Sequence, residues 1–201
     1  MGFLADQYAT AVHETAKSID WANVEKAVQA LVRVRANGGR LFILGLGGSA
    51  GNASHAANDF RKLAHLECYA PTDNASEMTA RINDEGWGSF FIGWLRVSRL
   101  SENDAVLVLS VGGGDVKRGV SIELVEALRL AQQVKATILA IVGRDGGFAG
   151  TVADHLMLIP TVDSGLVTPI AEAYQAVIWH GMVTHPDLAA ESAHWEALGA
   201  S

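Results

Sequence analysis

Short runs of consecutive apolar residues recur along the chain, and each run has the length of a β-strand. Few polar residues interrupt them, which is typical of parallel strands that are covered by helices on both faces. The runs lie within residues 40–49, 105–111, 136–143 and 155–160, with a shorter candidate at 66–71. The pattern therefore predicts a mostly parallel sheet of five strands.

Segments with apolar residues at helical spacing separate these runs. The predicted helices cover residues 3–17, 22–36, 49–64, 122–134, 148–153 and 169–183. Strands that alternate with helices predict an α/β fold, here a three-layer sandwich. The first two helices precede every strand.

The domain organisation is predicted to be simple. The 201 residues contain no internal repeat, low-complexity tract or linker, and this length is enough to bury one substantial core. We expect a single domain over residues 1–201. Within it, residues 1–37 are N-terminal helices for oligomer packing, and residues 38–201 form the α/β sandwich and the C-terminal helices.

The second predicted helix carries an apolar stripe formed by Val24, Val28, Leu31 and Val32. A peripheral helix pair needs less apolar surface than this stripe offers. We therefore expect the N-terminal helices to pack against other subunits.

Charge and composition exclude several classes of protein. The formal net charge is −7 and no run of basic residues occurs, which argues against a nucleic-acid partner. No apolar stretch approaches the ~18 to 20 residues that cross a bilayer, and the first residues lack a signal-peptide core, so we expect a cytoplasmic protein with no membrane partner. The single cysteine, Cys68, forms no internal disulfide and is expected to be a small apolar residue of a strand.

Three glycine-rich loops follow predicted strands, at Gly45–Ala50, Ser110–Asp115 and Gly143–Gly147. Ligands of open parallel sheets bind where such loops follow the carboxyl ends of the strands. The first loop also fits a dinucleotide-binding fingerprint with Glu67 as its acidic residue, although Glu67 falls at the start of the second strand rather than at its end. Tight strand-to-helix geometry alone is a further explanation of the glycines.

Two pairs of metal-binding side chains lie on predicted helices. His55 and Asp59 are four residues apart, so both side chains lie on one helix face and can reach one ion. Glu172 and His180 are eight residues apart, roughly 12 Å along a helix axis. Two imidazoles and two carboxylates suit zinc, and a divalent ion can polarise a carbonyl group while a carboxylate or imidazole moves a proton. A single histidine on a helix is more often a packed or surface residue, so the argument rests on the four together.

The stretch LGLGGSAGNASHAANDF at residues 44–60 resembles the sugar isomerase (SIS) domain, and within it the phosphoheptose isomerases. GRDGG at residues 143–147 and the helix that ends in His180 resemble the same family in the same order. The resemblance implies a SIS-type sandwich preceded by an N-terminal helical hairpin, formed by the predicted helices 3–17 and 22–36 and used in tetramer assembly. It implies a homotetramer and a cofactor that is a divalent metal, with zinc the expected ion. It also implies aldose/ketose isomerisation of a sugar phosphate, sedoheptulose 7-phosphate to a heptose 7-phosphate, through a metal-stabilised enediolate.

The resemblance assigns roles to the four metal-binding residues. It makes His55 a zinc ligand, Asp59 a ligand and the catalytic base, Glu172 a ligand, and His180 a ligand and the catalytic acid/base. Asp59 replaces a family glutamate, which pulls the carboxylate back by about an ångström, where catalytic geometry is demanding. Glu172 replaces a family glutamine and adds a negative charge to the site.

The loop that binds phosphate in the family, Ser-Thr-Ser-Gly-Asn-Ser, reads SVGGGD here, and Asp115 would repel a phosphate. Lys117 and Arg118 follow at once, and the glycine amides can form an anion nest, so we expect charge recognition in place of hydroxyl recognition. A solvated pair of surface cations is the alternative. The predicted substrate-binding set is Ser49, Asn52, Asp84, Ser110, Gly112, Gly113, Gly114, Lys117 and Arg118.

Two other functions fit the same residues. The altered phosphate loop is also expected of a non-catalytic sugar-phosphate-binding SIS module, whereas the retained His55 and His180 favour catalysis. An isomerase for a different sugar is the second alternative.

Overall fold

A computed structural model describes residues 2–198 and contains a parallel five-stranded sheet in the order β2-β1-β3-β4-β5. The strands are β1 Leu41–Gly45, β2 Cys68–Tyr69, β3 Ala105–Ser110, β4 Thr137–Val142 and β5 His155–Leu158. Each coincides with a predicted apolar run. The order reverses between β1 and β3, which opens a crevice at the carboxyl ends of these two neighbouring strands.

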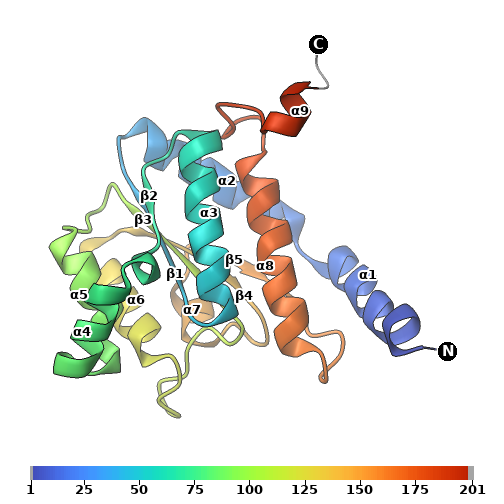
Figure 1. The fold of residues 1–201 in the computed structure, drawn as a ribbon, viewed down its shortest axis with the longest axis horizontal. Coiled ribbons are helices and arrows are strands. Elements are labelled where there is room, and N and C mark those ends of the chain that lie inside the picture. Colours follow the sequence, from blue (N-terminus) through green and yellow to red (C-terminus); the bar gives the residue numbers. More distant parts are fainter. Residues whose placement is uncertain (1, 199–201) are drawn as a thin grey trace.

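Helices cover both faces of the sheet and complete the predicted three-layer sandwich (Figure 1). The first layer contains α2 Trp21–Ala36, α3 Gly48–Ala64 and α8 Val167–Val183, and the second contains α5 Phe90–Val97, α6 Ile122–Val134 and α7 Gly147–Val152. Successive side chains of a strand point to opposite faces of the sheet, so alternate residues pack against the two helix layers. In β1, Leu41 and Ile43 lie in the core of the first layer, and Phe42 and Leu44 lie in the core of the second. All four side chains are buried.

The N-terminal segment begins with a π-helical turn, η1 Leu4–Tyr8, and continues as α1 Ala9–Ser18. Figure 1 shows α1 extending outward from the body of the molecule, beside α8. The Tyr174 hydroxyl of α8 donates a hydrogen bond to the Val12 carbonyl of α1 and holds the two helices together.

The apolar stripe of α2 is buried within the chain itself, so it does not offer the exposed surface from which contacts with other subunits were expected, and the packing of the N-terminal helices against other subunits stays a prediction. Val24, Val28 and Leu31 are buried in the core that the chain itself forms against the sheet and α8, and Val32 packs against that core. The helical period identified a buried face correctly but could not say what buries it. The large apolar side chains of this region that are exposed are instead Phe3, Leu4, Val12 and Trp21.

Two helices of the second layer were not predicted, α4 Ala75–Glu85 and α5. None of the α4 residues is buried, so apolar periodicity could not reveal it; its N-terminus is capped by the Asn74 side chain, which accepts a hydrogen bond from the Glu77 amide. Asn83 and Asp84 lie in the last turn of α4. Short helical segments complete the chain: η2 Pro71–Asp73, η3 Trp87–Ser89 and α9 His194–Leu198.

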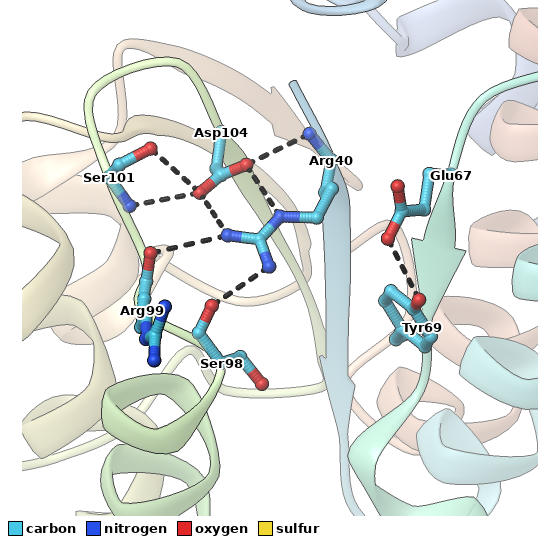
Figure 2. Close-up of polar contacts among 7 residues, drawn as sticks. All are labelled: Arg40, Glu67, Tyr69, Ser98, Arg99, Ser101 and Asp104. Atoms are coloured by element: carbon cyan, nitrogen blue, oxygen red, sulfur yellow. Dashed lines mark hydrogen bonds and ion pairs between the residues drawn. The ribbon is translucent and has the colours of Figure 1, made fainter. Parts of the chain in front are cut away.

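A polar cluster anchors the amino-terminal end of the sheet, opposite the glycine loops (Figure 2). Asp104 is 2% exposed and receives hydrogen bonds from the backbone and guanidinium of Arg40 and from Ser101. The same guanidinium donates to the carbonyls of Ser98 and Arg99 at the end of α5. Burial opposes ionisation of Asp104, but the hydrogen bonds outweigh it and hold its pKa below the usual value. The cluster ties β1, β3 and α5 together and is structural.

Glu67 precedes β2 and accepts a hydrogen bond from the Tyr69 hydroxyl at 2.8 Å (Figure 2). It therefore lies at the amino-terminal end of the strands, opposite the glycine loop, where it cannot bind the ribose of a dinucleotide held by that loop. Cys68 is buried in β2, as expected, and burial raises the pKa of its thiol. No helix among the described residues is both long and apolar enough to cross a membrane.

Candidate functional site

A cleft of about 780 Å³ opens at the carboxyl ends of β1, β3 and β4. Leu46 and Ser49 line it from the loop after β1 and the start of α3, and the segment 110–121 lines it after β3. Arg144, Asp145 and Gly147 contribute the wall that follows β4. This is the position at which sheets of this topology bind ligands.

Ser49 is held in the cleft wall by a hydrogen-bond chain between α3 and α8. Its hydroxyl accepts from the Gln175 amide at 3.0 Å, and the Gln175 carbonyl accepts from Asn52 at 2.9 Å. The Asn52 amide also donates to the backbone carbonyl of Glu172 at 2.9 Å. Gln175 is fully buried, and we did not predict it from the sequence; its signal was a glutamine on the apolar face of a helix. Asn52 thus lies beside the cleft as a positioning side chain.

The glycines of the β3 loop serve close packing against the β4 loop. A Cβ atom on Gly147 would lie 2.1 Å from the Gly112 carbonyl oxygen, and Gly147 has φ +53°. The Phe148 and Ala149 amides donate to the carbonyls of Gly114 and Gly113. Tight geometry therefore explains these glycines in part.

The anion nest expected from Gly112, Gly113 and Gly114 has fewer free amide donors than the sequence suggested. The Gly113 amide already donates to the Ser110 hydroxyl at 3.0 Å, inside the same loop. Ser110 is 8% exposed and lines the cleft with Gly112 and Gly114. Within residues 2–198, the amides of Gly112 and Gly114 have no hydrogen-bond acceptor, so two of the three proposed donors remain for a ligand.

Asp115 is a turn-forming residue rather than an isolated carboxylate beside the ligand. Its side chain accepts from the Lys117 and Arg118 amides at 2.9 and 3.0 Å and pairs with the Arg118 guanidinium at 3.3 Å. The backbone hydrogen bond from Arg118 is the main cause of its lowered pKa. The repulsion that we expected from Asp115 is therefore compensated within the loop, and Arg118 is partly neutralised by the same contact.

Three of the four predicted metal-binding residues meet on the outer surface of α3 and α8. One ligand atom from each of His55, Asp59 and His180 can be chosen so that all lie within 4.8 Å of one another. The Asp59 Oδ2 atom is 3.6 Å from the Nε2 atom of His55 and 3.8 Å from that of His180. The other Asp59 oxygen, Oδ1, accepts from Asn58 at 2.8 Å.

The two imidazoles of this group are oriented by their surroundings. The Nδ1 atom of His180 lies 2.8 Å from the Ala176 carbonyl oxygen, and donation there leaves the Nε2 lone pair directed at Asp59. The buried Trp179 ring stacks on His180 at 3.5 Å and meets His55 edge-on at 4.9 Å. Two oriented imidazoles and a carboxylate match the donor set of a divalent metal.

Glu172 lies outside this group of three ligands. Its carboxylate approaches Gly48 at the start of α3, where a Cβ atom would be 2.5 Å from the Glu172 carboxyl carbon. Eight residues of helix separate it from His180, which corresponds to about 12 Å along the axis. Glu172 is therefore at the cleft end of α8 and His180 at the other.

Asp84 is exposed on α4, accepts from its neighbour Asn83 at 2.7 Å, and is not among the residues that line the cleft of the same chain. Lys117 lines the cleft, and within residues 2–198 its ammonium group has no ion-pair partner.

Comparison with known proteins places these features in a family. The sequence model of the SIS domain matches residues 6–143. The lincomycin biosynthesis protein LmbN of Streptomyces lincolnensis is 35% identical over 156 residues, which are 72% of this chain and 54% of LmbN, so the chain spans about half of that relative. A probable phosphoheptose isomerase of Thermoplasma volcanium is 30% identical over 176 residues, 85% of each chain.

The fold is also similar to that of solved structures. The phosphoheptose isomerase GmhA from Neisseria gonorrhoeae superposes with a TM-score of 0.76 over 90% of this chain and 95% of that one, at 24% identity. A phosphoheptose isomerase from Francisella tularensis superposes with a TM-score of 0.73 over 87% of this chain and 89% of that one, at 23% identity. The family match over most of the sequence, the parallel sheet and the cleft at its carboxyl edge agree: the chain belongs to the SIS domain family.

Proposed function

We propose that this chain is an aldose/ketose isomerase of a sugar phosphate, with sedoheptulose 7-phosphate as the ketose and a heptose 7-phosphate as the aldose. The observation that carries the proposal is the composition of α3. Its first turn places Ser49 in the cleft, and about two to three turns later His55 and Asp59 meet His180. Relatives named phosphoheptose isomerase support the reaction class.

His55, Asp59 and His180 would hold the metal, for which we propose zinc because nitrogen and carboxylate donors suit it. A divalent ion bound there would supply polarisation of the substrate carbonyl. Glu172, which the sequence assigned to the same ion, is proposed instead to contact the substrate from beside Gly48.

Asp59 and His180 are proposed to move the protons. In the ketose-to-aldose direction, a base removes a proton from C1 while O2 gains one, which gives the enediol. O1 then loses its proton and C2 receives one, which gives the aldose with the same atoms. We assign the carbon-bound proton to the Asp59 carboxylate and the oxygen-bound protons to the Nε2 atom of His180, which faces the substrate rather than the metal while it carries a proton.

We propose that the active enzyme is a homotetramer in the cytoplasm, with each site between subunits. The His55 and His180 side chains are 58% and 47% exposed, so a second copy of the chain is needed to exclude water from the metal-binding group. Asp84, which lies away from the cleft of its own chain, is then available to the site of a neighbour. Light scattering tests this, and a monomer at micromolar concentration would contradict it.

The experiment for the reaction is an assay of the purified protein with a panel of ketose phosphates, with and without zinc, together with elemental analysis. We expect isomerisation, and metal bound to the wild type but absent from the double variant His55→Ala plus His180→Ala. The matched control is His13→Ala plus His194→Ala, two exposed histidines outside the group, which should bind metal normally. Full metal occupancy in the first double variant would refute the proposed ligands.

A non-catalytic sugar-phosphate-binding module remains the second candidate, and the altered β3 loop is the observation that favours it. Lys117, Arg118 and the amides of Gly112 and Gly114 offer anion contacts but no hydroxyl groups. Tight binding of ketose phosphates without any turnover, by protein with its metal sites filled, would support this candidate over the isomerase.

A further inference from the structure

Arg144 forms part of the wall of the same cleft that the 115–118 turn lines. It follows Gly143 at the end of β4, and β4 lies beside β3 in the sheet, so the loops after these strands face the same cleft. Its side-chain stem runs beside Gly112, where a Cβ atom would be 3.8 Å from the Arg144 Cδ atom. The sequence pointed to this loop only for its glycines and gave Arg144 no role.

The backbone of Arg144 is in a conformation that arginine rarely adopts. Its φ is +55°, in the left-handed region where glycine or asparagine would be favoured. The turn is fixed on either side, since the Gly146 amide donates to the Gly143 carbonyl at 3.0 Å and the Gly147 amide to the Asp145 carboxylate at 3.2 Å. A disfavoured backbone in a fixed loop at a cleft is a reason to ask what the side chain does.

The guanidinium of Arg144 is available to a ligand. Within residues 2–198 it makes no hydrogen bond or ion pair, whereas Arg118 is paired with Asp115. Three cations and two carboxylates line the cleft, so its lining has a net charge of +1 in a chain whose net charge is −7. This local excess of positive charge favours an anionic ligand.

We propose that Arg144 is the residue that recognises the phosphate group of the substrate, with Lys117 as a second cation of the same cleft. This rests on the proposed function and specifies how the site selects phosphorylated sugars. A guanidinium presents two parallel N–H groups that match two phosphate oxygens, which an ammonium group cannot do. Arg144 thus takes the place of the family hydroxyl groups that are missing between Ser110 and Ser121.

The test compares the wild type with Arg144→Gln, Arg144→Lys and Arg144→Gly. The glycine variant removes the side chain but suits the left-handed backbone, so it should fold even if the others do not. The matched control is Arg99→Gln. Arg99 is also an exposed arginine with a positive φ, +53°, but it lies at the amino-terminal end of the strands, away from the cleft.

For the phosphorylated ketose we expect KM to rise about tenfold to a hundredfold in Arg144→Gln and Arg144→Gly, with kcat within about twofold. The phosphate is held alike in the ground state and the transition state, so the loss falls on KM. Inhibition by inorganic phosphate should weaken by the same factor in these two variants. The Arg144→Lys variant should keep part of the phosphate affinity, and Arg99→Gln should have the same KM and the same phosphate inhibition as the wild type. An unchanged KM and unchanged phosphate inhibition in folded variants would overturn the proposal.

Binding of inorganic phosphate, measured directly by ³¹P NMR line broadening, separates this inference from the proposed function. A wild type that binds phosphate but turns over no sugar phosphate would refute the isomerase, while loss of that binding in Arg144→Gly would still support Arg144 as the anion-binding residue. Equal phosphate binding by the wild type and Arg144→Gly, or no binding by the wild type, would refute the role of Arg144.

Discussion

Replacing Gln175 with methionine should destabilise the protein and disturb the cleft together. The Gln175 side chain is fully buried between α3 and α8, and its amide makes one hydrogen bond to Ser49 and one to Asn52. Methionine has a similar length and fills the space but offers neither a donor nor a comparable acceptor. The change therefore removes two buried hydrogen bonds with little change in packing.

Each buried hydrogen bond contributes on the order of 1 kcal/mol to the free energy of unfolding, so Gln175→Met should lose about 2 kcal/mol. For a domain of about this size, 1 kcal/mol corresponds to roughly 2–4 °C, so Tm should fall by about 4–8 °C. Urea denaturation and calorimetry measure the two quantities. The freed Ser49 hydroxyl should also raise KM for the ketose phosphate.

The control for this prediction is Gln132→Met, because Gln132 is an exposed glutamine near the end of α6 and its change should leave the free energy of unfolding within about 0.5 kcal/mol of the wild type. A Gln175→Met protein as stable as that control, with an unchanged KM, would refute the reasoning that this amide positions Ser49.

Asp104→Ala should cost about 3–5 kcal/mol by urea denaturation, because it leaves the partner guanidinium without its carboxylate. Since its folded-state pKa is lowered, the stability from Asp104 is present above about pH 4 and is lost as the pH falls through the folded pKa; an Asp104→Ala protein with the same acid-denaturation curve as the wild type would contradict this. Gly147→Ala should separate the two glycine loops and lower Tm, since its Cβ would meet the Gly112 carbonyl at 2.1 Å, and an unchanged melting curve would count against that packing. Lys117→Ala plus Arg118→Ala should raise KM for the ketose phosphate by roughly tenfold or more with a smaller effect on kcat, and steady-state kinetics that match the wild type would mean that both cations are merely solvated.

The sequence best predicts the strands and helices that are buried in a uniformly apolar environment. The strands β1, β3 and β4 are covered on both faces, so each appears as an unbroken apolar run. The α6 helix was predicted at its observed ends, Ile122 and Val134, because one face of it is buried. By contrast, α4 has no buried residue, and its formation depends on the Asn74 cap and on ion pairs such as Arg81 with Glu77, which hydrophobic periodicity does not register.

Only those parts of the candidate site that lie on one helix could be predicted from residue spacing. His55 and Asp59 lie on one helix, so their spacing was sufficient, but the approach of His180 depends on how α8 packs on α3. Glu172 shares a helix with His180 yet lies at its other end, and helical rise alone should have separated the two. The Asp115 turn and the Gln175 hydrogen bonds require tertiary structure, which a single sequence does not contain.

The central claim is that the group of His55, Asp59 and His180 performs an aldose/ketose isomerisation. The most direct measurement is ¹H NMR of sedoheptulose 7-phosphate incubated with the wild type and with Asp59→Asn, both at equal measured metal content. The account predicts that aldose C1 signals appear with the wild type, and that Asp59→Asn lowers kcat by about 10²- to 10⁴-fold. No aldose from the wild type with its metal sites filled, or wild-type turnover by Asp59→Asn, would contradict it.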